Sequence, residues 1–520
     1  RARAPTDPSF GILESVFPIS APRVSWTALV PSFVYGAFLR LAGLTRQSFW
    51  VDEILTLRGA SVGEPFRWHD VLVNPQGPFP HVLLRIWIEL FGTSDLALRA
   101  WAATAGILAL GVGIWLARNL LPRGAVFAAW LFALSPFQIW YAQEVRNYAF
   151  LGLFALAAVA TFLGAWERGG MLRWLAHGAS LTGMLLSNLS GLFLLPVLGL
   201  FAVVQKPRCA VPWGGAALAA LLLVSPWLRA EFGSHVAWDA LAGAEEPVAV
   251  RGDLTFHPAG PAFAAATFVG GFGLTPPVRA LHEDTSIRVL RPHLPMLLAA
   301  CLATLCCFGA TWKRRGDPAT RFLWLWAFLP LALAAGVAIL GLKAFNPRYA
   351  AVAQPAWILL LGLGAGIIAA KRSGWGWAVG FVLVAVMLHG WGRQALDPAY
   401  ARDDFRGAAR FLSDRAQPGD LILEQGVTGP LERYLTDRSN LRTFYRGDFT
   451  RPPGGEGRLD LLLEGQERVW WVGCRLWLED PDARLLYQGL CILGKGRNEL
   501  VQEEYDRAAA TYGQALALYR

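Results

Sequence analysis

Charged residues are scarce in this chain of 520 residues. They make up 16% of it, whereas a soluble domain carries about 25%. Hydrophobic residues make up 54%, and the mean hydropathy is +0.38. So little charge combined with so much apolar sequence excludes an ordinary soluble domain and predicts a membrane protein.

A contiguous basic patch is also missing, although the net charge is +9. A nucleic-acid-binding protein gathers its basic residues on one face. Here they sit in short loops between apolar stretches, so the charge indicates membrane topology and no nucleic-acid partner. The 23 tryptophans agree with this interpretation, because an indole ring is favoured at both membrane interfaces.

Motifs for familiar cofactor and nucleophile chemistry are absent too. The sequence contains no Walker loop, no zinc-ligand spacing and no serine-nucleophile motif. Of six cysteines, Cys301, Cys306 and Cys307 lie in an apolar stretch and are expected to be small core residues. Cys474 and Cys491 lie in the polar C-terminal part. They can pair only if that part is exported, so a disulfide between them stays open.

What the chain does have is a series of apolar stretches, each close to the length of a membrane span. A span needs about 20 residues, and no cleavable signal peptide precedes the first one. We predict an α-helical polytopic membrane protein with about eleven transmembrane helices, followed by a small soluble α/β domain. The spans are expected near residues 26–44, 99–118, 124–141, 147–166, 174–189, 191–205, 212–228, 294–312, 321–341, 349–370 and 374–391.

Lys and Arg residues fall in alternate loops, which indicates the orientation. Cytoplasmic loops carry an excess of these residues, so the basic loops and the N-terminal residues 1–25 are expected in the cytoplasm. An odd number of spans then places the C-terminal part outside. The apolar stretch 259–275 is interpreted as interfacial or re-entrant, because a further span would turn a basic loop outward. The basic loops contain Arg118, Arg123, Arg168, Arg173, Lys206, Arg208, Lys313, Arg314, Arg315, Arg321, Lys371 and Arg372.

The predicted domains follow from this map. Residues 26–396 form the transmembrane domain, with outer loops at 45–98 and 229–293. From residue 397 to 520 the composition is that of a small extracytoplasmic α/β domain with a helical tail. Within it, residues 403–412 have helical apolar spacing, and residues 421–423 and 468–473 are strand candidates.

Asp52 and Glu53 stand just after the first span, in the outer loop. Carboxylates are expensive near hydrocarbon, so an acidic pair at this boundary is a candidate site. On a loop the two side chains point in different directions, which argues against a coupled dyad. One of them could act as a general base toward an acceptor hydroxyl or amine. The alternative is an interfacial capping or salt-bridging pair.

The segment 74–91 joins a Pro/Gly turn to a short amphipathic stretch. The stretch is too short to span and is expected to lie along the interface. Its turn would hold Asn74, Gln76 and His81 at the mouth of a cavity, as candidate acceptor-contacting residues. The alternative for His81 is a neutral interfacial histidine with satisfied hydrogen bonds, which is the commoner case.

Two further polar groups stand at outer ends of spans. Glu144 and Arg146 lie in the turn between two spans, where Arg146 could bind a phosphate or be neutralised by Glu144. Arg348 and Tyr349 stand at the start of a later span, where an arginine adds to the positive end of the helix dipole. The alternative is a snorkelling Arg–Tyr pair at the interface.

Together these motifs resemble the membrane-integral GT-C glycosyltransferases of family 39 and their bacterial relatives. That group includes protein O-mannosyltransferases and the aminoarabinose transferase acting on lipid A. The resemblance covers roughly residues 26–391 and depends on the order and spacing of four stretches. These are Phe49-Trp-Val-Asp-Glu, Pro78-Phe-Pro-His-Val-Leu-Leu-Arg with Phe91-Gly-Thr-Ser-Asp, Ser135-Pro-Phe with Tyr141-Ala-Gln-Glu-Val-Arg-Asn-Tyr, and Pro347-Arg-Tyr.

The resemblance implies an inverting glycosyltransferase that takes a sugar from a polyprenyl-phosphate donor at the outer face. It implies Asp52 as general base, and Arg146 and Arg348 as candidate ligands of the lipid phosphate. We further expect Glu53 to position Asp52 or the acceptor, Glu144 to orient Arg146 or contact the sugar, and Tyr349 to assist Arg348. The family often has an acidic residue and a His where this chain has Asn74-Pro-Gln-Gly-Pro, so the chain departs from the family pattern at this turn.

A metal is not required, because arginines alone can stabilise a leaving phosphate; if one is needed, Asp52 or Glu53 is the expected ligand.

The expected setting is a bacterial inner membrane, with a membrane lipid carrying the donor sugar and a glycan, lipid or protein as acceptor. The alternative function is a transporter or flippase of lipid-linked substrates. Transporters usually show inverted repeats and ionisable residues at mid-bilayer, and this sequence shows neither. A third possibility, an inactive assembly scaffold, would leave Asp52 dispensable.

Overall fold

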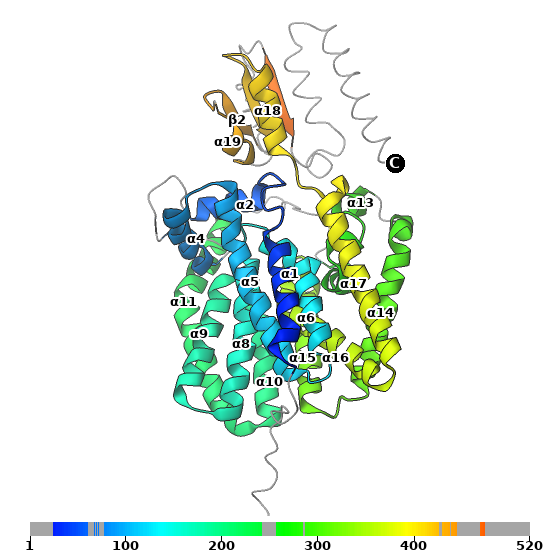
Figure 1. Ribbon diagram of the computed structural model, residues 1–520. Coiled ribbons are helices and arrows are strands. Elements are labelled where there is room, and N and C mark those ends of the chain that lie inside the picture. Colours follow the sequence, from blue (N-terminus) through cyan, green and yellow to red (C-terminus); the bar gives the residue numbers. More distant parts are fainter. Residues whose placement is uncertain are drawn as a thin grey trace, which may run out of the picture. The chain divides into compact units, whose positions relative to one another are not determined.

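The computed structural model describes residues 24–60, 67, 69, 71, 77–241, 256–283, 286–425, 429–436, 438–444 and 468–473. The chain divides into two units (Figure 1). The membrane unit comprises Arg1–Arg46, Leu55–Pro277 and Ser286–Ala401, and the small unit comprises Gln47–Ile54, Val278–Thr285 and Arg402–Arg520. The helix α2 (Val51–Gly59) continues from one set of residues into the other.

All the secondary-structure elements described in the membrane unit are helices. Its long helices lie alongside one another (Figure 1). Its α-helices are α1 (Trp26–Leu41), α4 (Pro78–Phe91), α5 (Asp95–Leu120), α6 (Ala125–Leu134), α7 (Pro136–Ala142), α8 (Tyr148–Arg168), α9 (Met171–Ser187), α10 (Leu195–Gln205), α11 (Ala210–Leu241), α12 (Gly260–Gly270), α14 (Leu294–Trp312), α15 (Pro318–Ile339), α16 (Gln354–Lys371) and α17 (Ser373–Leu396). Short 3₁₀ helices are η2 (Leu189–Leu194), η3 (Pro207–Cys209), η4 (Phe272–Leu274), η5 (Ile287–His293), η6 (Pro347–Ala353) and η7 (Pro398–Tyr400).

Each of the eleven predicted spans falls on a helix. Among the described residues, seven helices are long and apolar enough to cross a membrane, or eight when the bent pair α6–α7 is counted. The predicted spans at 26–44, 174–189 and 191–205 fall on the shorter helices α1, α9 and α10. The helix α12 has 11 residues, fewer than the roughly 20 that a span needs. The chain is an integral membrane protein.

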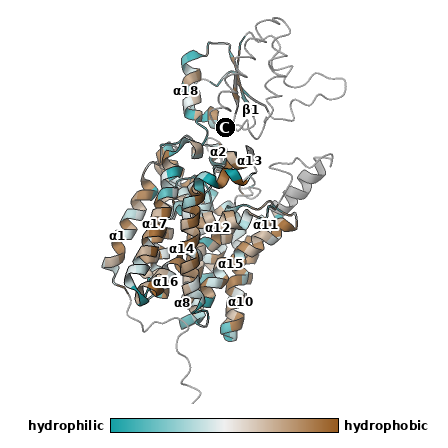
Figure 2. Cartoon of the chain, turned by 90° about the vertical axis from the view of Figure 1, so that its right-hand side faces the viewer, coloured by the Kyte–Doolittle hydropathy of each residue, from teal (hydrophilic) through white to brown (hydrophobic). Residues whose placement is uncertain are grey.

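Large apolar side chains cover the outside of the membrane unit as well as its core. Leu222 and Leu223 on α11 are 63% and 67% exposed, and Leu302 on α14 is 63% exposed. Figure 2 shows hydrophobic residues along α14 and along the coloured part of α11. In water such surfaces would be unfavourable, so they are the lipid-facing sides of the helices.

A break between α6 and α7 is closed by polar side chains from within the unit. The two helices meet at an angle of 46°, and Pro136 begins α7. Proline has no N–H to donate, so the break leaves carbonyls at the end of α6 without their helical partners. The buried Arg40 of α1 donates to the carbonyls of Phe132 and Ala133, at 3.1 and 3.2 Å. Its guanidinium also donates to Gln138 Oε1 at 3.1 Å.

The carbonyls at the end of α1 accept hydrogen bonds from Gln143, the residue that follows α7. Gln143 Nε2 donates to the carbonyls of Leu39 and Ala42, at 2.9 and 2.8 Å. The end of α1 thus supplies donors to the end of α6, and the residue after α7 supplies donors to the end of α1, as a low-dielectric interior requires. This exchange fixes where the chain leaves α7 for Glu144 and Arg146.

The small unit contains a parallel three-stranded sheet in the order β2-β1-β3, with β1 (Leu421–Gln425), β2 (Leu441–Phe444) and β3 (Val469–Gly473). Its described helices are α13 (Val278–Glu283), α18 (Phe405–Arg415) and α19 (Pro430–Tyr434). The predicted helix at 403–412 and both predicted strands are confirmed. The core contains Phe405, Leu412, Ile422 and Leu431, and Val51 of α2 packs with them. Cys474, Cys491 and the predicted helical tail lie outside the described residues.

Replacing Arg40 by Met is expected to destabilise the membrane unit. The substitution leaves the carbonyls of Phe132 and Ala133 without donors, and each buried unsatisfied group costs about 1–3 kcal/mol. We expect the free energy of unfolding to fall by about 2 kcal/mol or more, measured by thermal unfolding in detergent through tryptophan fluorescence. Arg46→Met, which removes an exposed cation close by, is the control. Equal midpoints for the two variants would contradict the capping role.

Candidate functional site

The acidic pair lies on a helix. The prediction that Asp52 and Glu53 stand on a loop is wrong, because α2 begins at Val51 and both carboxylates fall in its first turn. Negative charge is favourable there, since the N–H groups at a helix start are not bonded within the helix. Asp52 is 9% exposed and Glu53 is fully buried. Neighbouring helix positions point about 100° apart, so the two carboxylates have separate surroundings.

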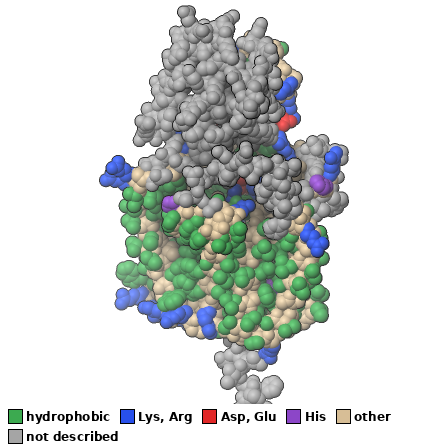
Figure 3. All heavy atoms as spheres, turned by 180° about the vertical axis from the view of Figure 1, so that it is seen from behind, with side chains coloured by type: hydrophobic (Ala, Val, Ile, Leu, Met, Phe, Trp, Pro, Cys, Tyr) green, Lys and Arg blue, Asp and Glu red, His purple; other side chains and the backbone are tan. Residues whose placement is uncertain are grey.

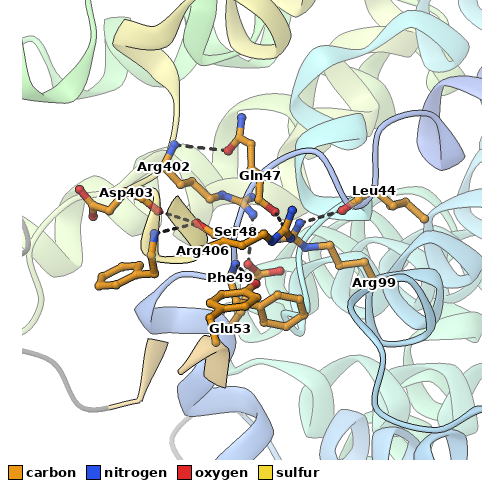
Figure 4. A network of polar contacts seen from close by, with 11 residues as sticks. Leu44, Gln47, Ser48, Phe49, Glu53, Arg99, Arg402, Asp403 and Arg406 are labelled. Atoms are coloured by element: carbon orange, nitrogen blue, oxygen red, sulfur yellow. Dashed lines mark hydrogen bonds and ion pairs between the residues drawn. The ribbon is translucent and has the colours of Figure 1, made fainter. Parts of the chain in front are cut away.

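Glu53 is bound by an arginine of the small unit. Arg402 Nη1 donates to Glu53 Oε2 at 3.2 Å, and both side chains are buried (Figure 4). The Arg402 guanidinium also lies 5.6 Å from the ring centroid of Trp50. A buried carboxylate requires such a partner, because an isolated charge in a low-dielectric interior is strongly unfavourable. Glu53 is therefore held in one position by its ion pair.

The residues before the acidic pair are bound to the same unit. Ser48 Oγ donates to the Asp403 carbonyl at 2.7 Å and accepts from the Phe405 N–H at 3.2 Å (Figure 4). The Phe49 N–H donates to Tyr434 Oη at 2.8 Å. The stretch predicted to belong to the first outer loop is thus built into the small unit.

Sequence reasoning missed Arg402 because its partner is 349 positions away. Arg402 follows α17, which ends at Leu396, and the sequence around it carries no motif that points to Glu53.

In the membrane unit, two predicted arginines converge on one aromatic ring. The guanidinium carbons of Arg146 and Arg348 each lie 5.9 Å from the ring centroid of Tyr148, the first residue of α8. Arg348 also lies 5.4 Å from the ring centroid of its neighbour Tyr349. Aromatic faces attract cations, and guanidinium groups are weakly hydrated, so rings can hold two of them in a partly buried place.

Hydrogen bonds hold the backbone at Arg348 and the side chain of Arg146. Asn346 Oδ1 accepts from the Arg348 N–H at 3.1 Å at the start of η6, as expected for an arginine in a first helical turn. Arg146 Nη1 donates to Thr56 Oγ1 of α2 at 3.3 Å. Asn147 Nδ2 donates to the carbonyl of Ser187 at 2.7 Å. Glu144, next to this turn, is 2% exposed.

His81 lies buried on α4, which is the predicted amphipathic segment. Its Nδ1 lies 2.6 Å from the Gly77 carbonyl and therefore carries the proton it donates. Its Nε2 has no hydrogen-bond partner among the described residues. The pKa of His81 is lowered to about 4, mainly by burial; the Gly77 carbonyl opposes this shift and the charge of Arg146 adds to it. The expectation of a satisfied histidine thus holds for one ring nitrogen only.

Gly77 is required for this placement of His81. Its φ is +88°, and a Cβ there would overlap the carbonyls of Leu186 and Ser187 at the end of α9. Asn74 and Gln76, predicted to stand at the same cavity mouth, lie outside the described residues. No group of three or more His, Cys, Asp or Glu side chains within the described ranges is arranged to hold a metal ion.

Removing the cation from Glu53 is expected to destabilise the small unit. In Arg402→Met the buried carboxylate loses its partner, which costs about 3–5 kcal/mol. Glu53→Gln combined with Arg402→Met should recover part of this loss, because a neutral amide needs no cation. A double-mutant cycle on thermal unfolding measures the coupling, with Arg410→Met, an exposed arginine of α18, as control. Additive effects would contradict a direct pair.

The lowered pKa of His81 predicts a pH dependence of stability. The unfolded chain takes up a proton at His81 near pH 6.5, whereas the folded chain does so only near pH 4. Stability is therefore complete above pH 6.5 and falls by roughly 3 kcal/mol as the pH drops toward 4. In His81→Asn the unfolding midpoint should depend less on pH over this range. In His257→Asn, at an exposed histidine, the pH dependence should be that of the wild type. Parallel curves for wild type and His81→Asn would contradict the shift.

Comparison with known proteins bears on the fold. Residues 75–229 match the family model described as dolichyl-phosphate-mannose-protein mannosyltransferase. No curated protein sequence matches the chain. The crystal structure of ArnT from Cupriavidus metallidurans in the apo state is similar over 81% of this chain and 86% of that chain, at 16% identity and a TM-score of 0.54. ArnT from the same organism bound to undecaprenyl phosphate covers 86% and 90%, at 15% identity and a TM-score of 0.48.

At such low identity the structural likeness concerns the fold. It confirms the GT-C fold that the resemblance implied. The chain is thus an integral membrane protein of GT-C fold, and its residues 75–229 carry the sequence pattern of a glycosyltransferase family.

Proposed function

We propose that the protein is an inverting glycosyltransferase that moves a sugar from a polyprenyl-phosphate donor to an acceptor at the outer face of the membrane. The observation that supports this best is the convergence of Arg146 and Arg348 on Tyr148. Two guanidinium groups beside one aromatic ring concentrate positive charge in a partly buried place, which suits an anionic ligand. A phosphate carried on a lipid has the charge and the location of such a ligand, and guanidinium forks fit phosphate oxygens.

The reaction needs charge stabilisation where the phosphate leaves. An acceptor oxygen or nitrogen attacks the anomeric carbon, and the bond from that carbon to the phosphate oxygen breaks. The electron pair stays on the phosphate, where Arg146 and Arg348 stabilise it. Attack from the opposite side inverts the configuration of the sugar. The arginines are sufficient for this role, so the proposal requires no metal.

The acceptor must lose its proton to a base, and Asp52 is the proposed one. Glu53 is held in a buried ion pair with Arg402, so its role is to position the first turn of α2. Glu144 and Tyr349 are proposed to orient the two arginines. His81, with its neutral ring, is proposed to accept a hydrogen bond from the acceptor through Nε2.

The family model supports the donor class, since its description names a polyprenyl-phosphate sugar. The alternation of basic loops supports an N-terminus in the cytoplasm and an outer C-terminal domain. A bacterial inner membrane is the proposed setting. The transfer experiment described next identifies the sugar and the acceptor.

Purified protein is expected to transfer label from one member of a panel of polyprenyl-phosphate sugars to a lipid, glycan or peptide acceptor. Asp52→Asn should lower turnover by at least a hundredfold, the lower range for a general base, with donor binding unchanged. Arg146→Gln and Arg348→Gln should each weaken donor binding by about tenfold or more, since a charge-assisted hydrogen bond contributes about 1.5–3 kcal/mol. Product formation and donor binding are measured separately.

Two variants serve as controls in that experiment. Asp404→Asn keeps a helix cap on α18, where Asp404 accepts from the Gly407 N–H, and should retain full turnover. Arg85→Gln removes a surface cation paired with Glu89 and should leave donor binding unchanged. Normal turnover in Asp52→Asn would remove its assignment as base. Labelled lipid crossing vesicles without any transfer would favour a transporter instead.

A further inference from the structure

A basic cavity lies at the end of the membrane unit opposite α4. It has a volume of about 690 Å³ and is formed by the turn after α5, the turn between α14 and α15, and the side of α16. Trp87 Nε1 of α4 donates to the Ala97 carbonyl near the start of α5. The cavity is lined by Leu120 and Leu121 at the other end of α5, a helix of 26 residues and thus about 39 Å long. It is therefore separate from the arginines and His81 described above.

The inner wall of the cavity is apolar and fixed by close backbone packing. Leu121 and Leu323 are 1% exposed, and Leu363 of α16 also contributes to the wall. A Cβ on Gly366 would overlap the carbonyl of Arg123, and one on Gly124 would overlap the carbonyl of Gly362. The turn after α5 thus rests directly on α16, as small residues allow in membrane helices. The cavity is a preformed feature of the packing.

The rim of the cavity carries three cations. Arg123, Lys313 and Arg314 line it and are exposed. Across the described part of the chain, none of their side chains takes part in a hydrogen bond or an ion pair with another residue. The one carboxylate in the lining, Asp317, is engaged in capping α15, where its Oδ2 accepts from the Thr320 N–H at 2.9 Å and from Thr320 Oγ1 at 2.8 Å. Among the described residues that line the cavity, three cations stand against one carboxylate, so the lining carries a net positive charge.

We propose that this cavity binds the headgroup of an anionic phospholipid. Charge complementarity requires an anion, and the apolar wall requires that the anion carry apolar chains. Figure 3 shows Lys and Arg side chains gathered along the lower edge of the membrane unit, below a band where hydrophobic side chains predominate. A lipid at this edge places its phosphate among the cations while its chains follow the exposed apolar side of α14, where Leu302 and Leu305 are 63% and 60% exposed.

The lipid is distinguished from a soluble anion by the shape of the cavity. A free phosphate would contact the rim alone and leave the wall of Leu121, Leu323 and Leu363 in water. Trp312 at the end of α14 is 51% exposed. Because tryptophan is favoured at membrane interfaces, it indicates that this end of the unit lies at the interface. A phospholipid satisfies the cations and covers the apolar wall together.

The test measures binding of phosphatidylglycerol to the purified full-length protein by native mass spectrometry, with phosphatidylcholine as the neutral reference. The wild-type protein is expected to retain more phosphatidylglycerol than phosphatidylcholine. Lys313→Gln combined with Arg314→Gln should lower this retention on the order of tenfold, because each basic residue near an anionic headgroup contributes roughly a fivefold effect. Arg315→Gln combined with Arg321→Gln is the matched control. It also removes two exposed cations, one from the same turn and one from the first turn of α15, but neither residue lines the cavity.

The outcomes are distinguishable. Equal loss in both double variants would mean general attraction by the basic turn and would overturn the site. Equal retention of both lipids by wild type would also overturn it, as would tight binding of inorganic phosphate without lipid. If the first double variant fails to insert, Arg123→Gln tests the same cavity from a different turn. Sugar transfer does not enter the readout, so the proposed function and this site can fail independently.

Discussion

The hydrocarbon core offers no hydrogen-bond partners, and this constraint shapes the membrane unit around the break at Pro136. A broken span frees backbone carbonyls that must be satisfied from within the protein. Arg40 supplies donors to the end of α6, and Gln143 supplies donors to the end of α1. Because Gln143 directly precedes Glu144 and Arg146, this exchange also determines where the site residues of the membrane unit begin.

The surroundings of Asp52 and Glu53 also suit these two neighbouring carboxylates to different roles. Asp52 and Glu53 have the same chemistry and adjacent positions, but Glu53 is fully buried and bound by Arg402. An ion pair of this kind contributes less to net stability than to holding one conformation, because desolvation offsets most of the attraction. The small unit thus supports the start of α2 through Glu53, and Asp52 is the carboxylate proposed for chemistry.

Features that depend on local pattern could be predicted from the sequence. Apolar runs near 20 residues predicted helices at all eleven span positions, and the amphipathic stretch at 78–91 predicted α4. Arg348 was expected at a helix start and lies in the first turn of η6. Features that depend on distant partners could not. The pairing of Glu53 with Arg402, the capping by Arg40 and the convergence of Arg146 with Arg348 join segments tens to hundreds of residues apart. The acidic pair was expected on a loop because its helix has only nine residues and weak apolar periodicity.

The two groups of cations in the membrane unit differ in a way that bears on what each can bind. Arg146 is 7% exposed and lies against an aromatic ring, so it is already partly desolvated and its position is fixed. An anion that reaches it loses water on entry and is held in one geometry, which suits a reacting phosphate. Lys313 and Arg314 are exposed on turns and keep their hydration. They can attract many anions but orient none, so selectivity at that end must come from the apolar wall behind them.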